Sequence, residues 1–255
     1  MKKPSVCIIK TDGTNCDAET SYAFEKAGGN VKVISLNQLK NNKKLFNEFQ
    51  ILAIPGGFSY GDDIASGKIF ALELVSFLQE SIYEFVNQKK LIIGICNGFQ
   101  VLVRMGLLPS KNSDQFAATL INNDSGKFEC RWVNMIIEKS PCIFTQGLEG
   151  KEISLQVAHG EGKFYCNNEQ LSNIEKNNLV VLRYSHNGRS TNQYPENPNG
   201  ALNAIAGICD PSGHIFGLMP HPERFVEKYH YPNWRHEEVS PQGLLIFERA
   251  INYFL

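Results

Sequence analysis

The sequence has no long hydrophobic run and almost no net charge, and both absences narrow what the protein can be. The formal charge of the 255 residues is −1, which gives no reason to expect binding to nucleic acid or to an anionic membrane. The first apolar run, residues 6–9, is too short for the core of a signal peptide. No later run approaches the length of a membrane span. We therefore expect a cytoplasmic chain, with neither a membrane nor nucleic acid among its partners.

The sequence also lacks closely spaced cysteines. Its seven cysteines contain no C-x-x-C pair and lie at positions 7, 16, 96, 130, 142, 166 and 209. An odd, scattered set argues against a disulfide framework and against a zinc site. Cys7 and Cys209 lie within apolar, strand-like runs, where cysteine packs as a small hydrophobic residue. We therefore predict no metal site, and Cys96 needs a separate explanation.

Repeats, low-complexity segments and flexible linkers are absent as well, so the sequence predicts a single domain over residues 1–255. Hydrophobic residues make up 42% and charged residues 20%, as in a globular protein. Short apolar runs typical of buried parallel strands occupy residues 5–9, 31–35, 51–54 and 91–95. Helix candidates alternate with them at residues 18–27, 66–87 and 98–106. This alternation predicts an α/β fold, with a mostly parallel sheet and helices on both faces.

The second half of the sequence is rich in strands instead. Strand-like segments occupy residues 131–138, 152–158, 179–184, 203–209 and 214–219, and helix candidates occupy 168–177 and 242–254. Residues 210–213, Asp-Pro-Ser-Gly, predict a turn between two of those strands. The polar residues 187–200 are interpreted as a long surface loop.

Cys96 stands within GICNGFQ, residues 94–100, between an apolar run and a helix-like segment. G-x-Cys-x-G matches the strand–turn–helix elbow that holds a nucleophile, with cysteine in place of serine. Such a turn crowds the positions two before and two after the nucleophile, which explains Gly94 and Gly98. The N-terminus of the following helix would favour a thiolate and stabilise an oxyanion. A buried structural cysteine between two glycines fits the same short pattern, so both interpretations stay open here.

A cysteine nucleophile needs a base, and MPHPER, residues 219–224, offers one. Two prolines hold this segment extended, so His221 and Glu223 project to the same side. The carboxylate can then orient the imidazole, which takes the thiol proton. Residues 54–58, Ile-Pro-Gly-Gly-Phe, would let backbone N–H groups approach a substrate closely. The alternatives are a surface turn with an incidental His–Glu pair and a plain strand-ending turn.

Taken together, these residues resemble the class I, or triad-type, glutamine amidotransferases. GICNGFQ, with PGG before it and HPE near the C-terminus, carries the resemblance, which runs nearly end to end. Further stretches are similar to the glutaminase subunits of phosphoribosylformylglycinamidine synthase: GTNCDAET (13–20), PGGFSYGDD (55–63), AHGEGKFYC (158–166) and MPHPER (219–224). The family implies a flavodoxin-like α/β sheet with a β-rich insertion. The tail around residues 229–241 is longer than in the shortest family members, which leaves its role open.

The resemblance implies a role for each candidate site residue. Cys96 would be the nucleophile, His221 the general acid and base, and Glu223 the residue that orients it. The remaining roles go to backbone and pocket residues: the oxyanion hole to the N–H groups of Gly57 and Asn97, and glutamine binding to Gly56, Gln100, His159 and Gly160. No metal ligand is implied.

The implied reaction is glutamine hydrolysis through a glutamyl thioester. The ammonia would pass to a synthetase subunit that converts formylglycinamide ribonucleotide to formylglycinamidine ribonucleotide in purine biosynthesis. We expect no cofactor in this chain, with ATP and Mg²⁺ on the large synthetase subunit, and the need for a small third subunit stays open. A stand-alone cysteine hydrolase or peptidase is a second interpretation, against which the lack of an evident substrate domain weighs. A non-catalytic binding subunit is a third, against which the intact Cys96, His221 and Glu223 weigh.

Overall fold

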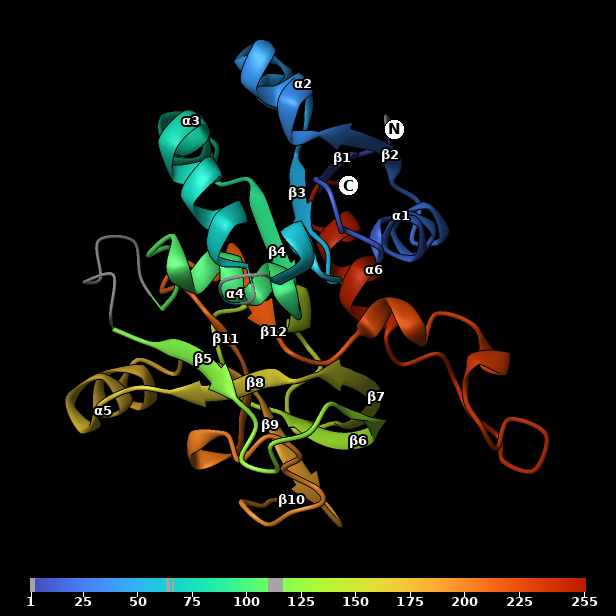
Figure 1. The fold of residues 1–255 in the computed structure, drawn as a ribbon. Coiled ribbons are helices and arrows are strands. Elements are labelled where there is room, and N and C mark those ends of the chain that lie inside the picture. Colours follow the sequence, from blue (N-terminus) through green and yellow to red (C-terminus); the bar gives the residue numbers. More distant parts are fainter. Residues whose placement is uncertain (1–2, 63–64, 66, 110–116) are drawn as a thin grey trace.

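The computed structural model describes residues 3–62, 65, 67–109 and 117–255, and a mixed sheet forms its centre (Figure 1). The strand order is β2-β1-β3-β4-β12-β11-β9-β6-β7, with β10 beside β9. The strands from β2 to β12 pair in parallel, and those from β12 to β7 pair antiparallel. The predicted α/β fold, with a parallel sheet and a β-rich second half, is confirmed.

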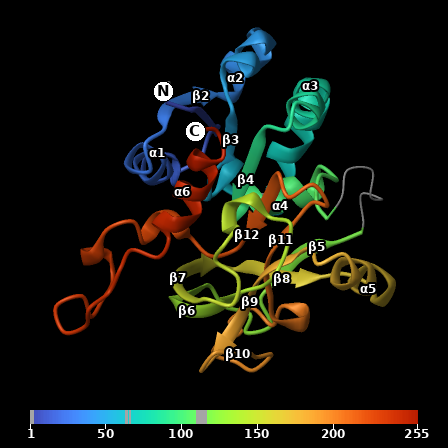
Figure 2. The same ribbon diagram turned by 180° about the vertical axis from the view of Figure 1, so that it is seen from behind.

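The parallel half alternates strands with helices that cover both of its faces. Its strands are β1 (Ser5–Lys10), β2 (Asn30–Ser35), β3 (Ile51–Ile54), β4 (Leu91–Ile95) and β12 (Ile215–Leu218). Its helices are α1 (Asp17–Lys26), α2 (Leu36–Asn41), α3 (Lys68–Asn87), α4 (Asn97–Arg104) and α6 (Leu244–Asn252). Helices α3 and α4 lie on one side of these strands, and α1 and α6 lie on the other (Figures 1 and 2). The rings of Phe24 and Phe247, 4.8 Å apart, pack α1 against α6.

The antiparallel half extends the same sheet and carries a small second sheet. Its strands in the main sheet are β6 (Glu129–Ile137), β7 (Glu152–His159), β9 (Val180–His186), β10 (Arg189–Ser190) and β11 (Ile205–Cys209). The second sheet pairs β5 (Thr119–Asn122) with β8 (Glu161–Tyr165), and α5 (Asn168–Lys176) follows it. The predicted turn between β11 and β12 is present, because the Gly213 N–H donates to the Asp210 carbonyl at 2.9 Å.

Burial explains why the strands were recognisable. Strands β3, β4 and β12 are buried along their whole length, and a strand covered on both faces carries a continuous apolar run. Strand β7 instead alternates buried side chains with more exposed ones, as expected where one face meets solvent. Cys7 and Cys209 are fully buried within β1 and β11, in agreement with their predicted role as small hydrophobic residues.

The structure departs from the sequence-based expectations at several elements. Helix α2 and strands β5, β8 and β10 were not predicted. Strand β11 begins two residues later than expected, because residues 202–204 form a short 3₁₀ turn. The predicted start of α3 at position 66 lies outside the described residues, as does Asp63 of the PGGFSYGDD stretch.

The surface-loop interpretation of residues 187–200 is wrong for residues 197–199. Asn197 and Asn199 are buried. The Asn199 amide donates to the Gly162 carbonyl at 2.7 Å and to the Tyr184 hydroxyl at 3.0 Å. These polar side chains supply hydrogen bonds that buried backbone groups require, so a polar composition here does not indicate exposure.

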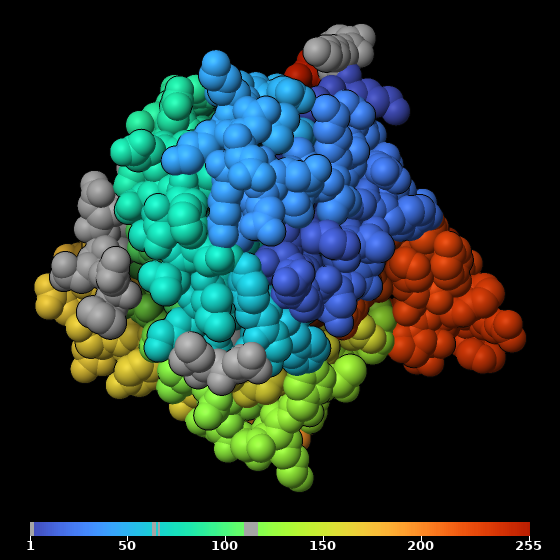
Figure 3. Space-filling view, turned by 45° about the horizontal axis from the view of Figure 1, so that its top comes forward, coloured from blue at the N-terminus to red at the C-terminus, as the bar shows by residue number. Residues whose placement is uncertain are grey.

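Residues 228–241 project from the body of the molecule on the side of α6 (Figures 1 and 3). The Tyr231 ring anchors the base of this projection, 5.2 Å from the ring of Trp132 and 5.6 Å from that of Phe225. None of the helices in the described part of the chain combines the length and apolar character that crossing a membrane requires.

Candidate active site

The carboxyl ends of four parallel strands meet at one edge of the sheet, and a single cavity lies there. The segments that follow β1, β3, β4 and β12 all reach it, and the end of β7 forms a further wall. The cavity has a volume of about 270 Å³. Its lining is Asn15, Cys16, Gly57, Phe58, Asp62, Cys96, Gln100, Phe128, Cys130, Ala158, His159, Gly160, Glu161, His221 and Arg224. Segments far apart in sequence therefore place three cysteines and two histidines around one space.

Cys96 occupies a strained turn between β4 and α4. Its φ is 51° and its ψ −105°, a conformation that non-glycine residues rarely adopt and that is common at functional sites. Its N–H donates to the Leu218 carbonyl at 2.8 Å, which ties the turn to β12. A Cβ on Gly98 would lie 1.9 Å from the Ile54 carbonyl oxygen, and one on Gly94 would lie 2.5 Å from the Gly98 oxygen. The crowding that the sequence pattern predicts on both sides of the cysteine is thus present.

His221 and Glu223 form a buried pair directly after β12. The His221 Nδ1 and Glu223 Oε1 atoms are 2.6 Å apart, and the two residues are 2% and 1% exposed. The His221 N–H donates to the Gln156 carbonyl at 2.8 Å, which fixes the backbone to β7. Two residues apart in an extended segment, the two side chains meet as predicted.

The surroundings of His221 favour its charged form. Burial lowers the pKa of the imidazole, but the Glu223 carboxylate and the sulfur atoms of Cys96 and Cys16 outweigh burial and raise this pKa well above its usual value. An imidazolium at His221, as the predicted transfer of a thiol proton would produce, is therefore stabilised. His221 Nε2 is buried and has no hydrogen-bond partner among the described residues, so it is available for that proton.

The two predicted oxyanion donors come from the segments that follow β4 and β3. Asn97 is the first residue of α4, where backbone N–H groups have no partner within the helix. Gly57 has a φ of +118°, and a Cβ there would lie 2.4 Å from the Asn15 side-chain oxygen, so this position requires glycine. The Asn97 side chain accepts a hydrogen bond from Ser59 Oγ at 2.5 Å and donates one to Asp62 Oδ1 at 3.1 Å. These bonds join α4 to the segment that carries Gly57.

Three of the four predicted glutamine-binding residues line the cavity. Gln100 donates from Nε2 to the Glu161 carbonyl at 2.5 Å, and Gly160 lies between His159 and Glu161. Burial lowers the pKa of His159 to about 3, so the neutral ring donates from Nδ1 to Asn123 Oδ1 at 3.1 Å. The fourth residue, Gly56, lies behind the wall, where a Cβ would be 2.8 Å from His221 Cε1. Because Gly56 has no side chain, it leaves room for the His221 imidazole.

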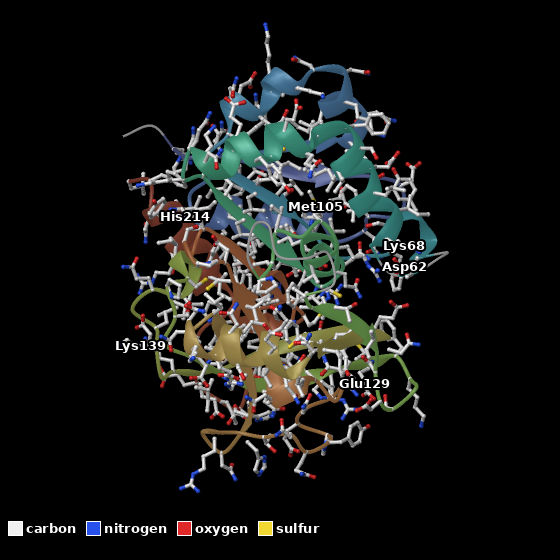
Figure 4. All side chains as sticks on the ribbon, turned by 90° about the vertical axis from the view of Figure 1, so that its left-hand side faces the viewer. Asp62, Lys68, Met105, Glu129, Lys139 and His214 are labelled. Atoms are coloured by element: carbon white, nitrogen blue, oxygen red, sulfur yellow. The ribbon has the colours of Figure 1, made fainter. Side chains whose placement is uncertain are left out.

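The cavity spans both halves of the molecule. Figure 4 shows Asp62 on the parallel half and Glu129 on the antiparallel half. Glu129 pairs with His159 across β6 and β7, so Glu129 shows where the cavity wall formed by the antiparallel half lies. The rings of Phe58 and Phe128, one from each half, stack with their centroids 6.2 Å apart and remain about half exposed at 47% and 53%. These two half-exposed rings therefore form an apolar part of the cavity lining.

Sequence reasoning did not assign a role to several lining residues. The clearest case is Cys16, whose sulfur accepts a hydrogen bond from Arg224 Nη2 at 3.4 Å. Both residues stand in stretches that the sequence singled out, GTNCDAET and MPHPER. Their place in these stretches was therefore the only sequence feature that pointed to Cys16 and Arg224. It did not predict that the two side chains contact each other.

Comparisons with known proteins agree with this geometry. The family model of the CobB/CobQ-like glutamine amidotransferase domain matches residues 3–254. The chain is 46% identical over 256 residues to phosphoribosylformylglycinamidine synthase subunit PurQ of Dehalococcoides mccartyi, an alignment that covers 99% of this chain and 98% of the relative. It is 40% identical over 267 residues to the subunit of the same name from Methanococcus maripaludis, covering 98% of this chain and 97% of the relative.

Solved structures show the same likeness. The chain superposes on a chain from the structure of PurLQS from Thermotoga maritima with a TM-score of 0.77 and 34% identity, covering 100% of both. A glutamine amidotransferase from the same organism gives a TM-score of 0.56 at 13% identity, covering 100% of this chain and 98% of that one. The second match shows a shared fold alone. Both confirm the fold class predicted from the sequence.

Proposed function

Because the chain belongs to the CobB/CobQ-like glutamine amidotransferase family, we propose that it hydrolyses glutamine as the glutaminase subunit of phosphoribosylformylglycinamidine synthase. The family model and the relatives that bear this name match it over nearly its whole length. The ammonia it releases is used to form formylglycinamidine ribonucleotide in purine biosynthesis. The observation that carries the chemistry is the buried His221–Glu223 pair at the cavity that also receives Cys96.

The reaction proceeds in two steps at Cys96. The thiol proton passes to His221, and the thiolate attacks the side-chain amide carbon of glutamine to form a tetrahedral intermediate. The imidazolium returns the proton to the departing nitrogen, so ammonia leaves and a glutamyl thioester remains. Water, deprotonated by His221, then attacks the thioester and releases glutamate and the thiol. Glu223 holds the imidazole in the orientation that both transfers require.

Backbone donors stabilise the charge that develops on the substrate oxygen. The N–H groups of Asn97 and Gly57 are assigned to this oxyanion hole. Their positions depend on the strained turn at Cys96 and on the positive φ of Gly57. Gln100, His159 and Gly160 form the wall that receives the rest of the glutamine molecule.

This chain acts with partners that supply the rest of the machinery. We assign ATP and Mg²⁺ to the large synthetase subunit and no cofactor to the glutaminase chain. The similar Thermotoga maritima chain comes from a structure described as PurLQS, which supports assembly with a synthetase subunit and a small third subunit. A cytoplasmic location fits the seven cysteines, all of which are free thiols.

Dependence on the partner distinguishes this function from a stand-alone cysteine hydrolase. Uncoupled hydrolysis would drain glutamine, and the loop that carries Gly57 is a flexible candidate for completing the site only in the complex. Loss of one oxyanion donor costs roughly 10² to 10³ in rate, so a small loop displacement is enough to switch the site off. We expect weak glutaminase activity from the isolated chain and an increase of at least about 10² when the synthetase and its substrates are added. Equal turnover in both conditions would favour the stand-alone hydrolase.

A further inference from the structure

Residues 228–241, here called the arm, project from the body of the molecule and carry aromatic side chains outside it (Figures 1 and 3). Tyr229 is 59% exposed. Trp234 is partly exposed, and the Arg235 guanidinium lies 5.0 Å from its ring centroid. A loop of this length is uncommon unless it has a function. Tyr, Trp and Arg are enriched among the residues that carry the binding energy of protein interfaces, so the composition of the arm is that of a surface that contacts another protein.

The arm is held in one shape by its own hydrogen bonds. The Trp234 N–H donates to the Tyr231 carbonyl at 3.2 Å, and the His236 N–H donates to the Asn233 carbonyl at 2.8 Å. The Asn233 side-chain amide also donates to Glu237 Oε1 at 2.9 Å. A surface that is ordered before it binds pays a smaller entropy cost on association. The arm therefore presents its aromatic side chains ready to dock.

Both ends of the arm meet on the segment that carries His221 and Glu223. The Gly243 N–H, just after the arm, donates to the Phe225 carbonyl, just before it, at 3.0 Å. A Cβ on Gly243 would lie 2.0 Å from the carbonyl oxygen of Pro222, which stands between the proposed base and the carboxylate that orients it. The same segment lines the cavity. A protein bound to the arm therefore lies beside the site that is proposed to release ammonia.

We propose that the arm is the docking element for the synthetase subunit, and that Tyr229 and Trp234 enter an apolar pocket on that subunit. The inference rests on the proposed function, in which ammonia passes from this chain to the synthetase. With histidine neutral, the two basic and two acidic side chains of the arm leave it without net charge, which favours burial of aromatic rings over electrostatic attraction. A second copy of this chain does not consume ammonia, so the position of the arm beside the cavity favours the synthetase over self-association.

Binding of the intact chain to the purified synthetase tests the arm directly. Affinity would be measured by biolayer interferometry, with the small third subunit and the nucleotide at the same concentrations for every variant. Tyr229→Ala and Trp234→Ala should each weaken binding at least about tenfold, mainly through faster dissociation. Phe77→Ala is the matched control, because this ring is 48% exposed and has Lys40 Nζ 4.4 Å from its centroid. It belongs to α3, on the side of the sheet away from α6 and the arm (Figures 1 and 2), so its affinity should equal that of the wild type.

Activity measurements separate a docking role from damage to the enzyme. Without the synthetase, Tyr229→Ala and Trp234→Ala should keep the weak glutaminase rate and the free energy of unfolding of the wild type, because neither side chain lines the cavity. In the complex, half-maximal stimulation should require a higher synthetase concentration, by the same factor as the affinity falls. At saturating synthetase, both variants should reach the wild-type rate.

Two results would overturn the docking element and leave the proposed function intact. One is wild-type affinity for the synthetase in either arm variant. The other is loss of self-association in these variants, measured by sedimentation equilibrium, with synthetase binding unchanged. A complex that forms through the arm but hydrolyses no glutamine refutes the proposed function alone, and a wild-type chain that does not bind the synthetase refutes both.

Discussion

Adding a single methyl group at Gly98 should disable the active site without touching a catalytic side chain. A Cβ at this position would lie 1.9 Å from the Ile54 carbonyl oxygen and 2.7 Å from its carbonyl carbon, both backbone atoms of β3. Real Cβ atoms essentially never come closer than 3.0 Å, so α4 must withdraw from β3 by at least 1.1 Å. Gly98→Ala would therefore move the helix whose first turn holds Asn97 and follows Cys96.

The magnitude follows from that displacement. A 1 Å misplacement of reacting groups costs about 10² in rate, so Gly98→Ala in the assembled complex should reduce glutamine-dependent turnover by at least about 10²-fold. Overpacking of this kind destabilises a protein by about 1–3 kcal/mol, which leaves a folded chain. Synthesis from added ammonium should continue, because that reaction does not use Cys96.

A matched control separates the displacement from a general loss of stability. Gly150 has a φ of +78° and nothing within 4 Å of an added Cβ, and it precedes β7 at the end opposite His159. Gly150→Ala should cost about 1–2 kcal/mol through left-handed backbone strain, with turnover unchanged. Chemical denaturation would measure both stabilities, and glutamate release would measure both rates. Turnover of Gly98→Ala within a few-fold of the wild type would refute the role assigned to the crowded turn.

Three further predictions concern titratable groups of the cavity. Cys96→Ser should abolish glutamine-dependent synthesis in the complex but spare synthesis from ammonium. An electrophilic glutamine analogue should label Cys96 and not Cys16, as peptide mass mapping would show, and labelling of both cysteines would contradict the assignment. His221→Ala should lose more glutaminase activity than Glu223→Ala, because a misoriented imidazole keeps some basicity; near-normal rates for His221→Ala would transfer the role to another histidine. His159 has a folded pKa of about 3 against about 6.5 unfolded, so its contribution to stability is present above pH about 6.5 and is lost as the pH falls toward 3. Below pH about 6.5, the wild type should therefore lose about 1.4 kcal/mol of unfolding free energy per pH unit relative to His159→Gln. Chemical denaturation between pH about 7.5 and about 5.5 would measure this loss. If the unfolding free energies of the two proteins changed equally with pH, the result would count against a neutral His159.

The parts of the fold that could be predicted are those with a strong local signal. Residues 91–95 form a strand that is buried on both faces, and such a strand requires a continuous run of apolar residues. Strands β5 and β8 carry no such signal, because they are short and pair with each other across about forty residues. The burial of Asn199 depends on Tyr184 and Gly162, which reach it only in the folded chain. Its immediate neighbours in sequence, Pro198 and Gly200, gave no indication of burial.

The same distinction applies to the site. Cys96 was recognisable because its turn requires glycines two positions away on each side, and His221 because two prolines and a carboxylate stand beside it in sequence. Cys16 has no such neighbours. It reaches His221 because β3 lies between β1 and β4 in the sheet, with β12 beyond them, an arrangement set by strand order. The sequence therefore gave no indication that Cys16 lies beside His221 in the folded chain.

The pairing of β4 with β12 also determines when during folding the protein acquires chemical reactivity. Ile95 lies opposite Leu218, so Cys96 and His221, the proposed nucleophile and base, follow adjacent strands and stand more than a hundred positions apart in sequence. Contacts of such large sequence separation raise contact order and form late, after the entropy of closing a long loop has been overcome. The thiol therefore meets its base only once the intervening antiparallel half has been enclosed. A nascent or partly folded chain therefore lacks the pairing of Cys96 with His221 that the proposed hydrolysis requires.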